Sequence, residues 1–365
     1  MGLPRTGFEV GDIIRKHKHP LIESGYLNAH KKKVFTNLAN CRTAILGYHK
    51  DKCDNADCLH EQFSYNSCRD RHCPKCNGLK KERWILDREA DLLPVKYYHV
   101  VFTLPEQVNA LFVAHPKSMY KILFRAVSDT VKQFASDHKH LGAQTGMVAI
   151  LHTWGQNLAF HPHIHCIVPG GGLTPGNKWK NTKSNGKYLY PVKALSGVFR
   201  GKFCDYLIEL HRKGDITLDV PFDPERKYLH PFYKNKWVVY AKLPMYNAKQ
   251  VVEYLGRYTH RVAISNHRIK KTDNENVSFS WLNYKTSKVD IMHLSYLEFL
   301  RRFSMHVLPS GFMKIRHYGI LSSSKKKECL EIIREALQVT APGSKKGIAW
   351  QELFIMLFGH PHDQC

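Results

Sequence analysis

The chain has 365 residues, 43% of them hydrophobic, which is enough for a globular protein of two or three domains. Lysine and arginine outnumber aspartate and glutamate by 55 to 31, and the formal net charge is +24. A positive excess spread along the whole chain favours a polyanionic partner, and nucleic acid is the usual one. The sequence shows no signal-peptide pattern and no apolar run of about 18 residues, so we expect a cytoplasmic protein with no membrane contact.

The first 50 residues are basic with helical spacing, and a cysteine-rich stretch follows at 53–76. Cys73 and Cys76 are separated by two residues and followed by a glycine, which is typical of a zinc knuckle. A tetrahedral zinc needs four ligands, and Cys53 and Cys58 are the expected second pair. The spare candidates, for this ion or for a second one, are His60, Cys68 and His72. Because four thiolates leave no open position, we expect a structural zinc that supports folding and DNA contact.

Strands and helices alternate through the rest of the chain, which predicts an α+β core. Helical spacing appears at 78–94, 106–138, 194–213 and 247–260. Runs rich in β-branched and aromatic residues predict strands at 96–105, 146–155, 161–170, 236–244, 261–265, 277–284 and 288–294. Helices are expected to close the chain.

The stretch "FHPHIHCIVPGGG" places His163 and His165 two residues apart on a predicted strand. Alternate strand residues project from the same face, so the two imidazoles form half of a metal site. The preceding strand offers polar candidates for a third ligand in "HTWGQN", namely His152, Gln156 and Asn157. We expect Gln156, just before the turn. His161 is a weaker candidate because Pro162 interrupts the alternation.

The stretch "EYLGRYTHR" places Tyr254 and Tyr258 four residues apart, on one face of a predicted helix. An aromatic pair in a core is the common explanation of such spacing. Gly256 between them indicates a close backbone approach. Basic residues around the helix suit a phosphate-lined groove, and the DNA-binding candidates are Arg257, His260, Arg261 and Arg268.

Together these stretches resemble a known family. "FHPHIHCIVPGGG" resembles the His-hydrophobic-His motif of HUH single-strand endonucleases, and "EYLGRYTHRVAIS" is similar to the tyrosine helix of their two-tyrosine members. "YNSCRDRHCPKCNG" resembles the zinc-binding region of rolling-circle transposases of the insertion-sequence-91 type. The segments "YYHVVFTLP", "LHTWGQNL" and "LPSGFMKIRHYG" are also similar to that family, in the same order.

The resemblance implies an HUH endonuclease core, an antiparallel sheet flanked by helices, preceded by a small zinc-binding domain. The expected divisions are a basic helical segment at 1–50, a zinc-binding domain with its connecting helix at 51–94, a catalytic domain at 95–305 and a C-terminal helical region at 306–365. Tyr254 and Tyr258 would be nucleophiles, and His163, His165 and Gln156 would hold Mg²⁺ or Mn²⁺. Ligand softness alone would favour zinc, nickel or copper at two imidazoles.

The implied reaction is single-strand cleavage through a 5′-phosphotyrosine, which would mobilise an insertion sequence in a bacterial nucleoid. The chain has no phosphate-binding Gly-x-x-x-x-Gly-Lys-Ser/Thr motif, so host helicase and replication machinery are expected partners beside the DNA ends and target. A rolling-circle replication initiator is the main alternative. A zinc-dependent DNA-binding regulator without catalysis is an alternative of another class.

Overall fold

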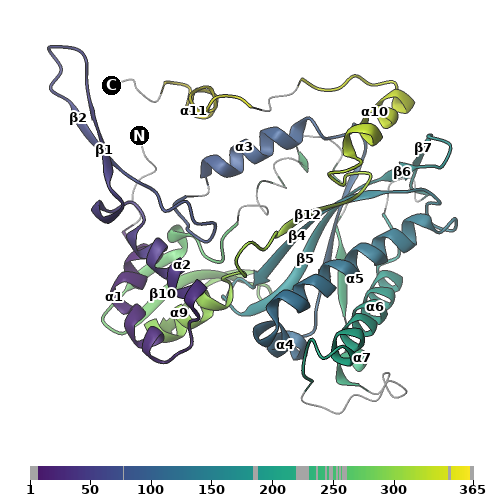
Figure 1. Cartoon of the computed structure of the whole chain (residues 1–365), viewed down its shortest axis with the longest axis horizontal. Helices are drawn as coiled ribbons and strands as arrows, with labels where there is room; N and C mark the ends of the chain where they lie inside the picture. The colour runs from purple at the N-terminus through teal and green to yellow at the C-terminus, as the bar shows by residue number, and fades with distance from the viewer. Residues whose placement is uncertain are drawn as a thin grey trace.

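The computed structural model describes residues 7–76, 78–183, 188–218, 230–235, 237–242, 245, 250–251, 254, 256, 261–343 and 347–361. The architecture is α+β, as the sequence predicts, with a central antiparallel sheet flanked by helices (Figure 1). A cluster of four cysteines lies near the N-terminus. Within the described part of the chain, no helix combines the length and the apolar character needed to cross a bilayer.

The central sheet has five strands in the order β12-β4-β5-β3-β8, and every neighbouring pair is antiparallel. In this order, the strands span Ile315–Gly319, Gly146–Trp154, Phe160–Pro169, Tyr97–Thr103 and Val238–Ala241. Four of them coincide with predicted strands. The fifth, β12, lies in the C-terminal region that was expected to be helical, and it completes the sheet by pairing with β4.

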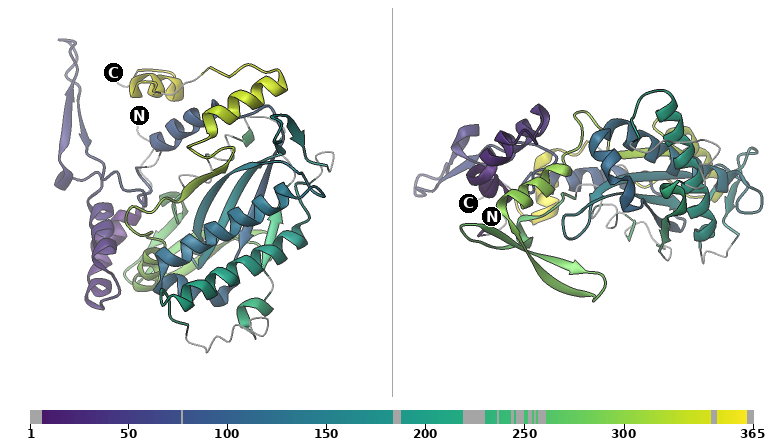
Figure 2. Two further views of the ribbon diagram at one scale, coloured as in Figure 1. Left: turned by 45° about the vertical axis from the view of Figure 1, so that its right-hand side comes forward. Right: turned by 90° about the horizontal axis from the view of Figure 1, so that it is seen from below.

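The two faces of the sheet follow from the alternation of side chains along its strands. Tyr98, Val100 and Phe102 of β3 point into the largest core, beneath helices α5 (Pro116–Ser136) and α6 (Val192–Arg212). Figure 2 shows these two helices side by side across the sheet. The short helices α4 (Asn109–Ala114) and α7 (Pro231–Lys234) and the 3₁₀ turn η2 (Glu106–Val108) flank this core.

The opposite face of the sheet carries the residues that alternate with those of the large core. Tyr97, Ile150 and Ile167 pack there with Val251 and with Leu330 of α10 (Lys326–Leu337). Helix α3 (Gly78–Glu89) contributes the partly buried Trp84 to the same cluster. Helix α11 (Trp350–Phe358) follows near the C-terminus. A small sheet of β6 (Gly171–Leu173) and β7 (Trp179–Asn181) extends beyond the end of β5.

A separate core joins the N-terminal helices to a three-stranded sheet from the second half of the chain. It packs α1 (Val10–Glu23), α2 (Ala29–Asn40) and α9 (Tyr296–Met305) against β9 (Ile269–Thr272), β10 (Asn276–Asn283) and β11 (Lys288–Ser295). Phe35, Phe279 and Phe299 are fully buried at its centre. The strands at 276–283 and 288–295 match the prediction, but the predicted strand at 261–265 is wrong. The ordered ladder begins instead at Ile269, after the turn η4 (Asn266–Arg268).

A two-stranded ribbon that the sequence did not predict connects α2 to α3. Its strands are β1 (Tyr48–Lys52) and β2 (Glu61–Tyr65), preceded by the turn η1 (Ala44–Leu46). Figures 1 and 2 show the ribbon extending away from the helices and sheets.

Candidate active site

Three histidines meet on the sheet face that carries α3 and α10. His152 of β4 is paired with His163 of β5, and Ile150 is paired with His165. Antiparallel partners share a face, so all three imidazoles project together. One nitrogen from each of the three rings lies within 4.8 Å of the others. His163 and His165 therefore lie together as their spacing predicted.

The third position of the group is filled by His152, where the sequence analysis expected Gln156. Gln156 lies in the turn after β4, and its Nε2 is 3.5 Å from the Tyr284 hydroxyl. The register of the two strands also shifts between His152 and Trp154. The strand alternation therefore ends before Gln156, and the structure does not bring its side chain into the histidine group.

The protonation of the histidine group suits a metal site. The Nδ1 of His163 donates to the carbonyl of His161 at 2.6 Å, which leaves Nε2 as the ligand atom. Burial lowers the pKa of His163 to about 4 and that of His165 well below its usual value. The neutral imidazole is the form of histidine that binds a cation. His161, the weaker candidate, contributes its carbonyl to this arrangement.

A fourth histidine connects this group to a tyrosine. The Nε2 of His99, on β3, lies 2.8 Å from the Nδ1 of His165. The Tyr254 hydroxyl lies 2.6 Å from Nδ1 and 2.8 Å from Nε2 of His99. Burial lowers the pKa of His99 to about 3, so its ring is neutral near pH 7. The sequence analysis missed His99. The signal that could have identified it was its position on one face of β3, where it alternates with apolar residues.

The tyrosine segment approaches α3 closely at Gly256. A Cβ at this position would meet the Cδ1 of Ile85 at 2.3 Å. The close approach expected from this glycine is therefore present. Tyr258, Arg257 and His260 lie outside the described residues.

The other two predicted DNA contacts occupy different environments. Arg261 is exposed, and its charge contributes to the lowered pKa of His165. Arg268 is partly buried and donates to the carbonyls of Gln156 and Ser280. Its guanidinium thus joins the β4–β5 turn to β10.

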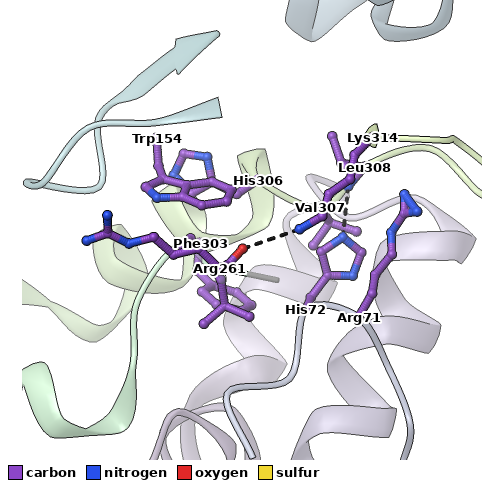
Figure 3. Close-up of a pocket in the computed structure, with 11 residues that line it drawn as sticks. Arg71, His72, Trp154, Arg261, Phe303, His306, Val307, Leu308 and Lys314 are labelled. Atoms are coloured by element: carbon purple, nitrogen blue, oxygen red, sulfur yellow. Dashed lines mark hydrogen bonds between the residues drawn. The ribbon is translucent and has the colours of Figure 1, made fainter. Parts of the chain in front are cut away.

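A small pocket is lined by Trp154 on one side and by His72 and Lys314 on the other (Figure 3). Trp154 lines it and stacks on His152, with ring centroids 4.8 Å apart. On the opposite wall, the Nε2 of His72 accepts from the Leu308 amide at 3.2 Å, and its Nδ1 bonds Asp70 at 2.9 Å. Both ring nitrogens of His72 are thereby engaged, which removes it from the spare zinc ligands. Lys314 donates to the Arg261 carbonyl, and burial lowers its pKa to about 8.

The cysteine cluster has the geometry of a zinc site. The Sγ atom of Cys41 lies 3.3 Å from that of Cys76 and 3.6 Å from that of Cys73, and Cys68 lies 3.7 Å from Cys76. Four sulfurs at about 2.3 Å from a tetrahedral zinc lie about 3.8 Å apart, so the four thiols fit the ion.

The predicted first pair of cysteines is not part of this cluster. Cys53 and Cys58 lie in the loop between β1 and β2, and among the described residues they join no group of three ligands. His60 is exposed at the end of the same loop. The antiparallel ribbon brings Cys41, which precedes it, beside Cys68, which follows it. Cys73 and Cys76 lie in the cluster as expected.

Two family models match this chain. Residues 146–328 match the model of a family described as putative transposase, and residues 13–104 match the transposase zinc-binding domain. The second match includes all four clustered cysteines.

Two curated relatives extend the match along the chain. The putative transposase y4qJ of Sinorhizobium fredii is 40% identical over 375 residues, covering 100% of this chain and 93% of its own. The transposase for insertion sequence element IS801 of Pseudomonas savastanoi pv. phaseolicola is 28% identical over 330 residues, covering 88% and 78% respectively. No solved structure matches. The chain therefore belongs to the insertion-sequence-91 family of transposases and carries that family's zinc-binding domain.

Proposed function

We propose that this transposase cleaves and joins single-stranded DNA through a 5′-phosphotyrosine, and mobilises an insertion sequence by a rolling-circle-like route. The observation that carries the proposal is the contact between the Tyr254 hydroxyl and His99, which in turn contacts His165 of the histidine group. A nucleophile, an adjacent imidazole and a set of metal ligands on one sheet face are the parts that such a reaction requires.

In the proposed step the Tyr254 oxygen attacks a backbone phosphorus. The new bond joins this oxygen to phosphorus, the bond from phosphorus to the 3′-oxygen breaks, and the leaving strand ends in a 3′-hydroxyl. A free tyrosine has a pKa of about 10, so its phenol is a poor nucleophile near neutrality. His99 would hold the phenol in position through the contact at its Nδ1, and the phenol proton would pass to solvent as the bond to phosphorus forms. Joining is the reverse attack by a 3′-hydroxyl, which needs no nucleotide cofactor.

His152, His163 and His165 are the proposed ligands of a catalytic divalent cation. A bound cation would polarise the phosphate oxygens and offset the charge that develops on them. Three nitrogen ligands suit zinc, nickel or copper by softness, whereas a phosphate substrate suits Mg²⁺ or Mn²⁺. We propose Mn²⁺ or Mg²⁺, with Tyr258 as a second nucleophile and the exposed Arg261 as a contact to DNA.

The proposal divides the chemistry between this chain and its host. The transposase would cut and rejoin DNA ends and target strands, and host helicase and replication proteins would unwind and copy the DNA. The four-thiolate zinc site would be structural, because it has no open position.

A covalent-adduct assay tests the proposal directly. A single-stranded oligonucleotide that contains an element end is labelled at its 3′ terminus and incubated with the protein and Mn²⁺. The 5′-phosphotyrosine should retain this label on the protein under denaturing conditions, whereas a 5′ label should leave on a fragment with an extendable 3′-hydroxyl. If the label never becomes protein-bound with any divalent metal, the non-catalytic regulator is the better account.

A further inference from the structure

The β1–β2 ribbon is exposed on both faces. All ten residues of its two strands are exposed to solvent. A two-stranded ribbon on its own has little stability in water, and exposed aromatic rings add to that cost. The sequence nevertheless places three such rings on this ribbon.

The rings lie on one face because of the strand register. Tyr48 is paired with Tyr65, and Lys50 with Phe63, so these four side chains project together, next to the Lys52–Glu61 pair. We refer to these six residues as the aromatic face. The opposite face is polar and consists of His49, Asp51, Gln62 and Ser64.

The three rings form one cluster with a cationic edge. The Tyr48 ring lies 5.4 Å from that of Phe63 and 6.0 Å from that of Tyr65, between centroids. The exposed fractions of Tyr48, Phe63 and Tyr65 are 54%, 51% and 40%. The Lys50 ammonium lies 5.7 Å from the Phe63 centroid and 2.8 Å from Glu61. The rings are therefore available to a partner, with lysine nitrogens beside them.

The cysteine cluster joins the two chain segments that enter and leave the ribbon. Cys41 precedes the ribbon and Cys68 follows it, and their sulfurs meet in the same group. Next to them, the Arg42 amide donates to the Asn66 carbonyl, and the Asn66 amide donates to the Gly47 carbonyl. A bound zinc would thus hold the aromatic face in a fixed position, which lowers the entropy cost of binding a partner.

We propose that the aromatic face binds single-stranded DNA, with bases stacked on Tyr48, Phe63 and Tyr65 and backbone phosphates beside Lys50 and Lys52. Aromatic rings interleaved with lysines suit this polymer because every base has a stacking face and every linkage a negative charge. The aromatic face carries two lysines against one carboxylate, Glu61, and the chain as a whole has a net charge of +24, which favours the same partner over an apolar protein surface. This inference rests on the proposed function for the choice of single-stranded DNA, and it adds a binding site separate from the histidine group.

The test compares the two faces of the ribbon in the full-length protein. One variant combines Tyr48→Ser, Phe63→Ser and Tyr65→Ser, and the matched control combines His49→Ser and Gln62→Ser on the polar face. The Kd for an unstructured oligonucleotide is measured by fluorescence anisotropy at fixed salt. Each stacked base contributes about 5- to 150-fold in affinity, so the aromatic-face variant should bind at least about tenfold more weakly. The control should stay within about twofold of the parent.

An abasic oligonucleotide separates stacking from a general loss of structure. The parent should bind the abasic strand more weakly than the normal strand, whereas the aromatic-face variant should bind both equally. Conservative Tyr48→Phe and Tyr65→Phe changes keep the rings and should restore parental affinity. Lys52→Gln should lower the salt dependence of log Kd by about 0.7.

Three results would overturn the proposal. The Kd of the aromatic-face variant could be unchanged, or this variant could lose affinity equally for normal and abasic strands. The variant could also change the oligomeric mass of the protein without changing its affinity for DNA. The adduct assay at saturating DNA distinguishes this failure from failure of the proposed function. If the aromatic face is not a DNA site, the parent still forms the adduct; if the proposed chemistry is wrong, the parent forms none.

Discussion

His152 lies directly opposite His163 in the β4–β5 ladder, and their ring centroids are 5.6 Å apart. This pairing places the third imidazole beside the two that the sequence motif supplies. It also leads to a prediction that distinguishes the role of His152 from that of Gln156, the ligand expected from the sequence.

His152→Ala should abolish adduct formation, by at least about 100-fold, because it removes one of three proposed metal ligands. Gln156→Ala is the matched control. Its rate of adduct formation should stay within a few fold of the parent rate, since the Gln156 side chain points to Tyr284. Single-turnover adduct formation across a Mn²⁺ titration measures both variants. A strong defect in Gln156→Ala together with full activity in His152→Ala would restore the original assignment.

A second prediction concerns the cysteines. Cys41→Ser and Cys68→Ser should each lose the bound zinc and lower the melting temperature, because a structural zinc contributes directly to folding. Cys53→Ser and Cys58→Ser, in the ribbon loop, should retain one zinc per chain. Metal content by mass spectrometry and thermal unfolding distinguish the two pairs. Loss of zinc from the Cys53 or Cys58 variant would contradict the ligand set seen in the structure.

The elements that could be predicted from the sequence are those with a strong local pattern. Strands β3, β4 and β5 either alternate polar with apolar residues or bury whole runs of apolar residues. Local strand geometry alone is enough to place His163 and His165, two residues apart, on the same face. The Cys73–Cys76 pair is likewise defined within four residues.

The remaining site residues depend on contacts between distant segments. Cys41 lies 27 residues before Cys68, and only the folded ribbon brings them together. Strand β12 is short and becomes a strand by pairing with β4, so its own pattern carried little information. His99 joins the site because β3 pairs with β5 in a particular register, and this register cannot be predicted from either segment alone.

The tyrosines give a third prediction. Tyr254→Phe removes the hydroxyl that contacts His99 and keeps the ring, so stability should change little while adduct formation falls sharply. Any residual adduct should form on Tyr258, and the double Phe variant should form none. Peptide mass spectrometry of trapped DNA locates the bond. An adduct on Tyr246 or Tyr284 would show that the proposed pair is wrong.

The last prediction tests the packing that places Tyr254, through Gly256 and Ile85. In Gly256→Ala, the new methyl group would meet the Ile85 Cδ1 atom at 2.3 Å, and overpacking of this kind costs about 1–3 kcal/mol. Alanine recovers about 1 kcal/mol of helix propensity, so the single variant should be neutral to destabilised by about 2 kcal/mol.

Ile85→Val deletes the Cδ1 atom that causes the clash, at a cost of about 0.5–1.5 kcal/mol by itself. Combined with Ile85→Val, Gly256→Ala should become less destabilising than it is in the parent, giving a favourable coupling energy in a double-mutant cycle. Chemical denaturation measures the cycle, and adduct formation should follow the same order because Tyr254 lies two residues from Gly256. Additive effects of the two changes would mean that Gly256 and Ile85 are not in contact in the folded protein.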